Sequence, residues 1–361
     1  MHLPRPFVQD SDVGFVRNIR QVNRGQCLSY AAGDPSELKA LSGGNRRVHW
    51  VLEVPKMALE FRRILLVLLP VATSLAQGIP GVVAADAKVE LVQEGFVFTE
   101  GPVGTADGGL YFSDLQTGDK TYRMDLSGKI SIYRDHTNGT NGLALTRDGA
   151  LLGAEGDGKR ISKIGPGGTV TTLTEGIGGM PLKAPNDLIV DSRGGIYFTD
   201  PGPRPVVAGR KAYVYYLPAG AKEPRIIDDQ ITRPNGLTLT TNGKTLIVDD
   251  TVGDTLFAFD VQADGSVKNR RPFAHMHDVK AGAESGADGM AIDRQDRIYV
   301  TSSTGLQVFD RKGQYLGTIK IPRQPANLAF AGTGKKTLYI TAREGLYRLT
   351  MLSQGPQRLG K

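Results

Sequence analysis

The fold of this chain is decided by a stretch that reads APNDLIVDSRGGIYFTD, residues 184–200. A polar segment is followed by a short apolar run, a turn at Arg193-Gly194-Gly195 and a second apolar run that ends on Asp200. Glycine pairs allow the positive φ of a tight hairpin turn, and Ile, Val, Tyr and Phe favour strands. Two strands this short cannot bury a core alone, so the stretch predicts partner copies elsewhere in the chain.

Five further copies of this unit are present. Each begins with Glu, Asn or Asp and continues through an apolar run, a turn and a second apolar run. The six starting residues, called the anchor residues below, are Glu100, Asn141, Asn186, Asn235, Asp288 and Asn327. Their spacing of 39 to 53 residues is typical of β-propeller blades. The sequence therefore predicts an all-β fold, a six-bladed β-propeller whose four-stranded antiparallel blades surround a central channel.

The first 76 residues differ from the repeats. Residues 1–56 show no period and contain the only Cys and the only Trp of the chain. From Met57 onward, two arginines precede an apolar run, and Ser74-Leu75-Ala76 has the small residues of a cleavage site. This pattern predicts a secretory signal peptide over residues 57–76, because the run is too short to favour a transmembrane helix. The alternative is a disordered extension followed by an interfacial apolar segment.

These patterns predict three parts of the chain. Residues 1–56 are expected to be disordered or to precede the true start, residues 57–76 to be the signal peptide, and residues 77–361 to form the propeller. The mature protein is then expected in the periplasm or secreted, without stable membrane insertion after cleavage. No obvious interface is evident in the sequence, so we expect a monomer or a weak homo-oligomer.

Composition argues against several classes of function. The formal net charge of +7 comes partly from the first 76 residues, and the remaining excess is too small to predict nucleic-acid binding. Cys27 lies before the propeller, so thiol catalysis and Cys-zinc sites are not expected there. The common nucleotide-binding, serine-hydrolase and zinc-protease motifs are missing. His275 and His277 are either metal ligands or, as we favour, part of a solvated loop between blades.

The anchor residues predict the functional site. In a propeller the first strand of each blade lies nearest the channel, so the residue that enters it lies at the channel mouth. Two carboxylates and four amides would then face one centre. Such oxygen ligands suit a hard divalent cation, with Ca²⁺ the first choice and Mg²⁺, Mn²⁺ or Zn²⁺ the alternatives. The competing interpretation is that Asn-Gly and Asp-Gly pairs are only turn residues, but their shared register across six repeats favours a site.

These motifs resemble those of the gluconolactonase and senescence-marker-protein (regucalcin-like) family of six-bladed, calcium-dependent propellers. The resemblance covers about residues 90–350. The segments that carry it are residues 99–102, 184–188, 197–201, 233–237, 286–293 and 327–330.

The resemblance implies roles for particular residues. The metal ligands would be Glu100, Asn186, Asn235 and Asp288, and the substrate would contact Asn141, Asn186, Lys183 and Asp200. The chain departs from the family pattern before Pro185, where Lys183-Ala184 replaces an arginine, and in the short loop after Pro201. Lys183 or Arg204 would then supply the positive charge for the substrate.

The implied function is a metal-dependent hydrolase that opens a sugar-type lactone with metal-activated water. Asp288 would act as general base or nucleophile, and Asn141 and Asn186 would donate hydrogen bonds to the developing oxyanion. Two alternatives remain open. One is hydrolysis of another ester or of a phosphotriester at the same site, and the other is a non-catalytic ligand-binding propeller with a structural cation.

Overall fold

The computed structural model describes residues 74–75, 78–165 and 168–358. The predicted extension and signal peptide lie outside the described residues, except for the two that form β1 (Ser74–Leu75). Residues Val67–Lys361 form one compact unit, and the description below concerns this unit alone. Among the described residues, no helix has the length and apolar character that crossing a membrane requires.

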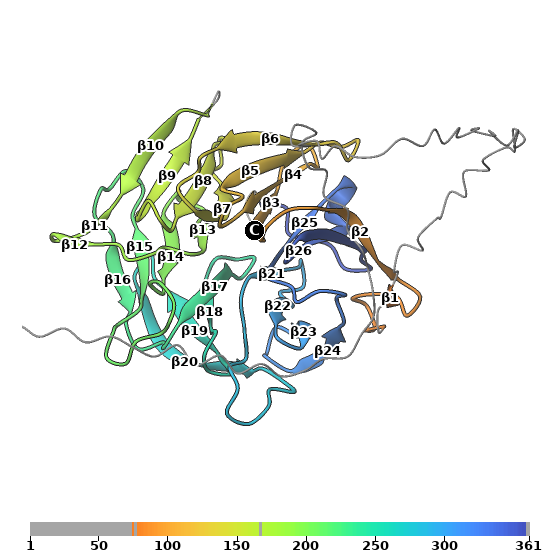
Figure 1. The fold of residues 1–361 in the computed structure, drawn as a ribbon. Helices are drawn as coiled ribbons and strands as arrows, with labels where there is room; N and C mark the ends of the chain where they lie inside the picture. The colour runs from red at the N-terminus through yellow and green to blue at the C-terminus, as the bar shows by residue number, and fades with distance from the viewer. Residues whose placement is uncertain (1–73, 76–77, 166–167, 359–361) are drawn as a thin grey trace, which may run out of the picture. The chain divides into compact units, whose positions relative to one another are not determined.

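Six antiparallel sheets surround one axis (Figure 1), which confirms the predicted six-bladed propeller. In the first five blades, strands that follow one another in the chain are hydrogen-bonded neighbours. Blade 1 contains β3 (Thr99–Gly104), β4 (Leu110–Asp114), β5 (Lys120–Met124) and β6 (Ile130–Asp135). Blade 2 contains β7 (Thr140–Leu145), β8 (Leu151–Glu155), β9 (Arg160–Ile164) and β10 (Val170–Thr174). Blade 3 contains β13 (Leu188–Val190), β14 (Ile196–Asp200), β15 (Tyr213–Leu217) and β16 (Arg225–Asp228).

The next two blades repeat this order. Blade 4 contains β17 (Pro234–Leu239), β18 (Thr245–Asp250), β19 (Thr255–Val261) and β20 (Val267–His275). Blade 5 contains β21 (Met290–Ile292), β22 (Ile298–Ser302), β23 (Gly305–Phe309) and β24 (Tyr315–Ile319). Two small elements lie outside this pattern, a two-stranded sheet of β11 (Gly176–Ile177) and β12 (Met180–Pro181), and the 3₁₀ turn η2 (Thr333–Lys335).

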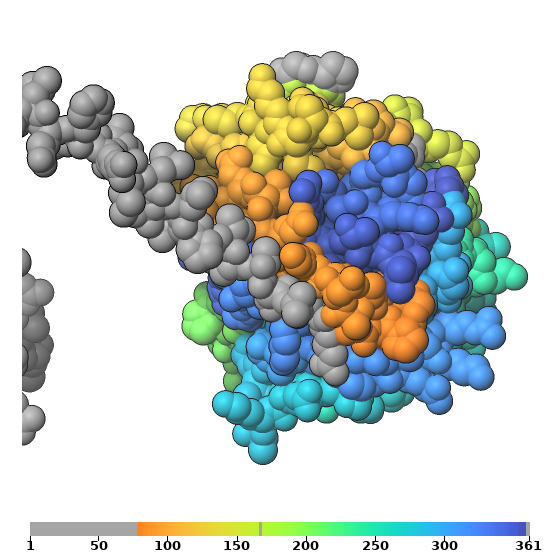
Figure 2. Space-filling view, turned by 90° about the vertical axis from the view of Figure 1, so that its right-hand side faces the viewer, coloured from red at the N-terminus to blue at the C-terminus, as the bar shows by residue number. Residues whose placement is uncertain are grey.

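The sixth blade combines the two ends of the described chain. Its inner strands are β25 (Asn327–Ala331), β26 (Thr337–Ala342) and β27 (Gly345–Thr350), and its next strand is β2 (Lys88–Glu94), with β1 at the edge. β2 pairs antiparallel with β27, so that Glu90 lies opposite Arg348. Figure 2 shows this N-terminal segment, in orange, against the blue C-terminal blade. The ring is therefore closed by backbone hydrogen bonds between strands far apart in sequence.

The core lies between the blades. Successive side chains of a strand point to opposite faces, and each middle strand is covered on both faces by its neighbours. On β14, Tyr197 packs with Leu237 of blade 4, whereas Phe198 packs with Leu152 of blade 2. Both aromatic side chains are fully buried. This two-sided burial explains why the strands read as nearly continuous apolar runs.

The inner strands approach one another closely around the axis. β3, β7, β13, β17, β21 and β25 contact one another in sequence, and β25 contacts β3, which completes the ring. A Cβ atom on Gly101 would lie 2.0 Å from the carbonyl oxygen of Asn141, and one on Gly236 would lie 2.1 Å from that of Asp288. The glycine after an anchor residue thus leaves room for the backbone of the next blade's anchor residue. A role in a turn alone would not require this close approach.

Candidate metal and active site at the channel mouth

A cavity of about 270 Å³ lies at the end of the channel where the inner strands begin. Five of the six anchor residues line it, namely Glu100, Asn141, Asn186, Asn235 and Asp288. The sixth, Asn327, is buried and donates a hydrogen bond from Nδ2 to Oε2 of Glu100 at 3.0 Å. The structure therefore brings together all four residues predicted to bind a metal.

Glu100 is held rigidly in the wall of this cavity. It is only 2% exposed, and its Oε2 also accepts a hydrogen bond from the backbone N–H of Gly101 at 2.8 Å. Two donors from two different blades thus fix one oxygen of this carboxylate. Such support of a ligand by its neighbours is typical of metal sites.

Two of the amide groups have a buried oxygen without a partner. Oδ1 of Asn141 and Oδ1 of Asn235 are inaccessible to solvent and accept no hydrogen bond from any described residue. Nδ2 of Asn235 donates to Oγ1 of Thr251 at 3.1 Å, which fixes the amide orientation. An unsatisfied buried acceptor costs about 1–3 kcal/mol, so such groups usually have a functional reason. Amide and carboxylate oxygens are the ligands of Ca²⁺ in proteins, so the donor set fits a hard cation.

A further acidic residue, Asp249, lies behind the cavity wall. It is fully buried at the end of β18, and its Oδ1 accepts a hydrogen bond from the N–H of Gly236 at 3.1 Å. Burial, followed by the charge of Asp288, raises the pKa of Asp249 well above its usual value. Asp249 was not among the predicted site residues. Two consecutive acids in an apolar strand were the available signal, because strand alternation places one of them toward the axis.

Asp200 and Lys183, which were also predicted to contact substrate, are not among the residues that line the cavity. Asp200 is buried and accepts hydrogen bonds from the backbone N–H groups of Lys183 and Ala184 at 2.9 and 2.8 Å. Burial raises the pKa of Asp200 despite these bonds. Asp114 binds the equivalent loop of blade 1 in the same way. Nζ of Lys183 lies 4.6 Å from the ring centroid of Tyr213.

Charged residues from the loops complete the wall. Arg204, the other predicted substrate cation, lines the cavity and pairs with Glu284 at 2.8 Å. Their hydrogen bond raises the pKa of Arg204 and lowers the pKa of Glu284. Arg233 and Arg343 also line the cavity, and the sequence analysis missed both. Loop residues follow no repeat, so only the position of Arg233 two residues before an anchor gave a signal.

The two histidines lie elsewhere. The ring of His277 stacks on Tyr315 with centroids 3.9 Å apart, and Nδ1 of exposed His275 lies 3.2 Å from Oδ1 of Asp254. Neither residue lines the cavity at the channel mouth. His277 lies in the loop between blades 4 and 5, whereas His275 is the last residue of β20.

Comparison with known proteins identifies relatives over most of the propeller. The family model described as SMP-30/Gluconolactonase/LRE-like region matches residues 98–344. A gluconolactonase of Zymomonas mobilis is 25% identical over 309 residues, which cover 77% of this chain and 85% of that protein. The lactonase drp35 of Staphylococcus aureus is 31% identical over 139 residues, which cover 38% of this chain and 42% of that protein.

Solved structures show the same architecture. A gluconolactonase from Xanthomonas campestris superposes with a TM-score of 0.67 at 29% identity, covering 77% of this chain and 97% of that chain. A regucalcin from Agrobacterium tumefaciens, described as a calcium-binding protein, superposes with a TM-score of 0.65 at 20% identity over 75% of this chain and 95% of that chain. At this identity the second likeness shows the fold alone. The match to the family model covers more than half of the chain, which therefore belongs to the SMP-30/Gluconolactonase/LRE-like family.

Proposed function

We propose that this protein hydrolyses a lactone in the cavity at the channel mouth, with a divalent cation held by Glu100, Asn186, Asn235 and Asp288. Family membership and the gluconolactonase relatives support the reaction class. One observation carries the metal site. Asn235 buries an amide oxygen that has no hydrogen-bond partner among the described residues, in a cavity that three carboxylates, those of Glu100, Glu284 and Asp288, also line.

A bound divalent cation supplies Lewis acidity to a carbonyl oxygen and makes a nearby water easier to deprotonate. The residues of the chain perform the remaining tasks. Asp288 accepts a proton as the water oxygen adds to the lactone carbonyl carbon. The side-chain N–H groups of Asn141 and Asn186 donate hydrogen bonds to the carbonyl oxygen as it gains charge, and one such donor contributes about 3 kcal/mol in well-studied enzymes. The ring C–O bond then breaks, its oxygen takes up the proton, and a hydroxy acid is released.

The test is lactone hydrolysis by the full chain before and after removal of metal. Proton release from D-glucono-1,5-lactone is followed at constant pH, and the spontaneous rate is subtracted. The protein is used as purified, after chelation, and after addition of Ca²⁺, Mg²⁺, Mn²⁺ or Zn²⁺ in turn. We expect activity to disappear on chelation and to return with at least one cation.

Two results would contradict this proposal. If folded protein hydrolyses an aryl ester or a phosphotriester but no lactone, the reaction class is wrong. If no substrate is hydrolysed and chelation only lowers the melting temperature, the cation has a structural role and the propeller is a binding module. Calcium binding measured by calorimetry on the same samples separates loss of the cation from loss of the reaction.

A further inference from the structure

Three arginines line the same cavity as the anchor residues. Arg204 comes from the loop after β14, Arg233 from the segment that enters β17, and Arg343 from the turn between β26 and β27. Three separate parts of the chain thus bring positive charge to one cavity. A neutral sugar lactone offers these guanidinium groups only hydroxyl and carbonyl oxygens.

The three arginines differ in how their charge is balanced. Arg204 forms a bidentate ion pair with Glu284, in which the Nη2–Oε2 distance is 2.8 Å and the Nη1–Oε1 distance is 3.3 Å. In this geometry the carboxylate of Glu284 accepts two hydrogen bonds from the guanidinium and balances its charge. The hydrogen bonds described for Arg233 and Arg343 go to neutral oxygens instead, those of Gly202 and Gln324. The charge of Arg204 is therefore balanced by a direct pair, whereas Arg233 shares the charges of Asp288 and Glu284 with the other groups of the cavity.

Arg233 is the more unusual of these two residues. Its side chain is only 8% exposed, and its Nη1 donates to the carbonyl oxygen of Gly202 at 3.2 Å. Its Nε is buried and has no hydrogen-bond partner among the described residues. A buried guanidinium N–H without an acceptor is costly, so its retention at a cavity wall indicates a ligand that accepts this hydrogen bond.

Arg343 adds a second positive charge from blade 6. Its backbone has φ of 54°, in the left-handed region, and its carbonyl oxygen accepts hydrogen bonds from N and Oγ1 of Thr99 at 2.8 and 3.0 Å. Its Nη2 donates to Oε1 of Gln324, a neutral group, and its guanidinium lies 5.2 Å from the ring centroid of Phe98. The backbone is thus fixed, and the charge is held at the cavity without a carboxylate.

Charge balance in the cavity favours an anionic ligand. Glu100 and Asp288 supply two negative charges, which match the two positive charges of the proposed cation, and Glu284 matches Arg204. With the cation bound, the positive charges of the cavity, including those of Arg233 and Arg343, exceed the negative charges of the carboxylates that line it. A planar guanidinium recognises carboxylate or phosphate oxygens with two parallel hydrogen bonds, which a hydroxyl group does not offer.

We propose that the lactone opened by this site carries a negatively charged carboxylate or phosphate substituent, which Arg233 binds and Arg343 attracts. This inference rests on the proposed lactonase function and names its substrate class. The anion is bound apart from the cation, because Arg233 and Arg343 belong to the cavity wall and are not oxygen ligands. The substituent is thereby a second point that orients the lactone ring.

The test compares matched neutral and charged lactones. D-Glucono-1,5-lactone is paired with its 6-phosphate, and D-glucono-1,4-lactone with D-glucaro-1,4-lactone, so that one pair tests phosphate and the other carboxylate. We expect kcat/KM to be at least about tenfold higher for the charged member of one pair. This preference should weaken with rising salt concentration, because salt screens charges that solvent reaches.

Variants assign the preference to the arginine. Arg233→Gln should raise KM for the charged lactone roughly 10- to 100-fold, as expected for loss of a charged hydrogen bond, while the neutral lactone changes less than about threefold. Arg343→Gln should have a smaller effect of about three- to tenfold, and it keeps the test decisive if Arg233→Gln does not fold. Arg225→Gln, on the outer strand β16, is the control and should change neither substrate.

Two outcomes would overturn the inference. One is equal kcat/KM within both pairs, and the other is an equal loss for neutral and charged lactones in Arg233→Gln. In both cases hydrolysis of the neutral lactones would leave the proposed function intact. If no lactone is hydrolysed, the proposed function fails, and calorimetric binding of 6-phosphogluconate against gluconate still decides whether Arg233 binds an anion.

Discussion

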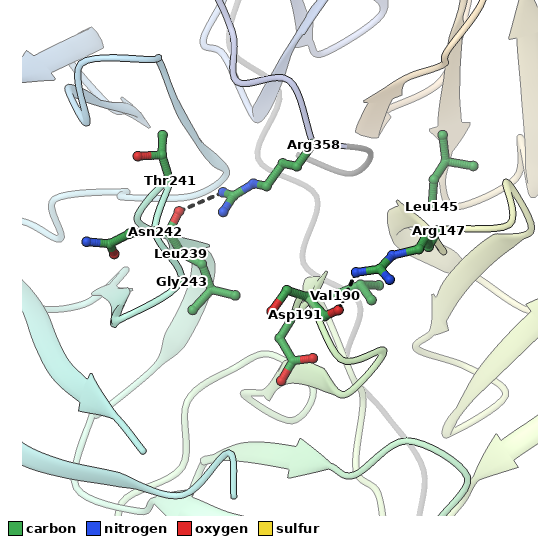
Figure 3. Close-up of a pocket in the computed structure, with 10 residues that line it drawn as sticks. Leu145, Arg147, Val190, Asp191, Leu239, Thr241, Asn242, Gly243 and Arg358 are labelled. Carbon is green, nitrogen blue, oxygen red and sulfur yellow. Dashed lines mark hydrogen bonds between the residues drawn. The ribbon is translucent and has the colours of Figure 1, made fainter. Parts of the chain in front are cut away.

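The two ends of the central channel differ in chemistry although the same strands form both. At the mouth, where the inner strands begin, acids, amides and arginines line a cavity of about 270 Å³. At the other end a larger cavity of about 360 Å³ is lined partly by Leu145, Val190 and Leu239, which lie at or near the last positions of β7, β13 and β17. Figure 3 shows Arg358, from the segment after β27, reaching into this second cavity.

The polar groups at the two ends of the channel differ in how completely they are hydrogen-bonded. Arg358 is half-buried, and its guanidinium donates to the carbonyl oxygens of Leu239 and Thr240 at 2.6 and 3.1 Å. Arg147, at the same end, donates to the carbonyl oxygen of Ser192 at 2.6 Å. At the mouth, by contrast, amide oxygens remain buried without partners. Buried polar groups without partners, rather than cavity size, therefore indicate that the mouth is the end that binds a ligand.

The largest effect is expected from Asp288→Asn at the mouth. This change removes a proposed metal ligand and the proposed base while keeping the size of the side chain. We expect kcat for lactone hydrolysis to fall by roughly 10²–10⁴-fold, the usual range for loss of a general base. Asp264→Asn, in the exposed turn between β19 and β20, is the matched control and should retain full activity. Near-normal turnover by folded Asp288→Asn would remove this residue from the mechanism.

Asn327→Ala tests the support behind the cavity. The change removes the hydrogen bond that fixes Oε2 of Glu100, so affinity for the activating cation should fall roughly 10- to 100-fold, as for other outer partners of metal ligands. Calorimetric titration with Ca²⁺ measures the effect. Asn242→Ala, which alters the cavity at the other end, should leave cation affinity unchanged. Equal affinities in both variants would mean that Glu100 does not depend on this support.

Arg358→Ala should affect stability and spare activity. The change removes the two hydrogen bonds that this half-buried guanidinium donates, so we expect the free energy of unfolding to fall by about 1–3 kcal/mol. Urea denaturation measures the stability, and the lactone assay should give kcat/KM within about twofold of the wild-type value. Loss of activity at unchanged stability would show that the two ends of the channel are functionally coupled.

The smallest effect is expected from the titration of Lys335, which should make the free energy of unfolding depend on pH. Burial, followed by the charges of Arg358 and Arg294, lowers the pKa of Lys335 to about 8, below its ordinary value of 10.5. Between these values the unfolded chain holds a proton that the folded chain has released, so the unfolding free energy should rise with pH. Since Lys335 is partly exposed, we expect a gain of about 1 kcal/mol.

The measurement compares the wild type with Lys335→Gln by urea denaturation at pH 7.5 and 9.5. The difference between the two proteins cancels contributions from other groups that titrate in this range. The gain should be present in the wild type and missing in the variant. An identical pH dependence in both proteins would contradict the assignment to Lys335.

Much of the fold could be predicted because it repeats. Six copies of one hairpin unit gave the number of blades, and the register of the anchor residues placed Glu100, Asn235 and Asp288 around one axis. The pairing of β2 with β27 was not predicted, because a bond between distant strands leaves no periodic signal. It is this pairing that closes the ring.

The loop residues of the site were harder to predict. Arg233 and Arg343 reach the cavity from non-repeating segments, and nothing in their local sequence shows where their side chains lie. Lys183 precedes an anchor by only three residues, yet its ammonium group lies over Tyr213. The prediction for Asp200 came from the family resemblance, and its bonds to the loop before Asn186 show that an acid at a strand end can stabilise the blade itself. Sequence register locates backbone positions, whereas tertiary contacts decide side-chain direction.

The most direct test of the central claim is a crystal structure of the protein soaked with Mn²⁺, measured at a wavelength where manganese scatters anomalously. We expect one anomalous peak at the channel mouth, within coordination distance of oxygens from Glu100, Asn186, Asn235 and Asp288. We further expect that the side-chain oxygen of Asn235, now without a partner, is one of the ligands. A peak elsewhere in the propeller, or a well-ordered channel mouth that holds water and no metal, would contradict the account.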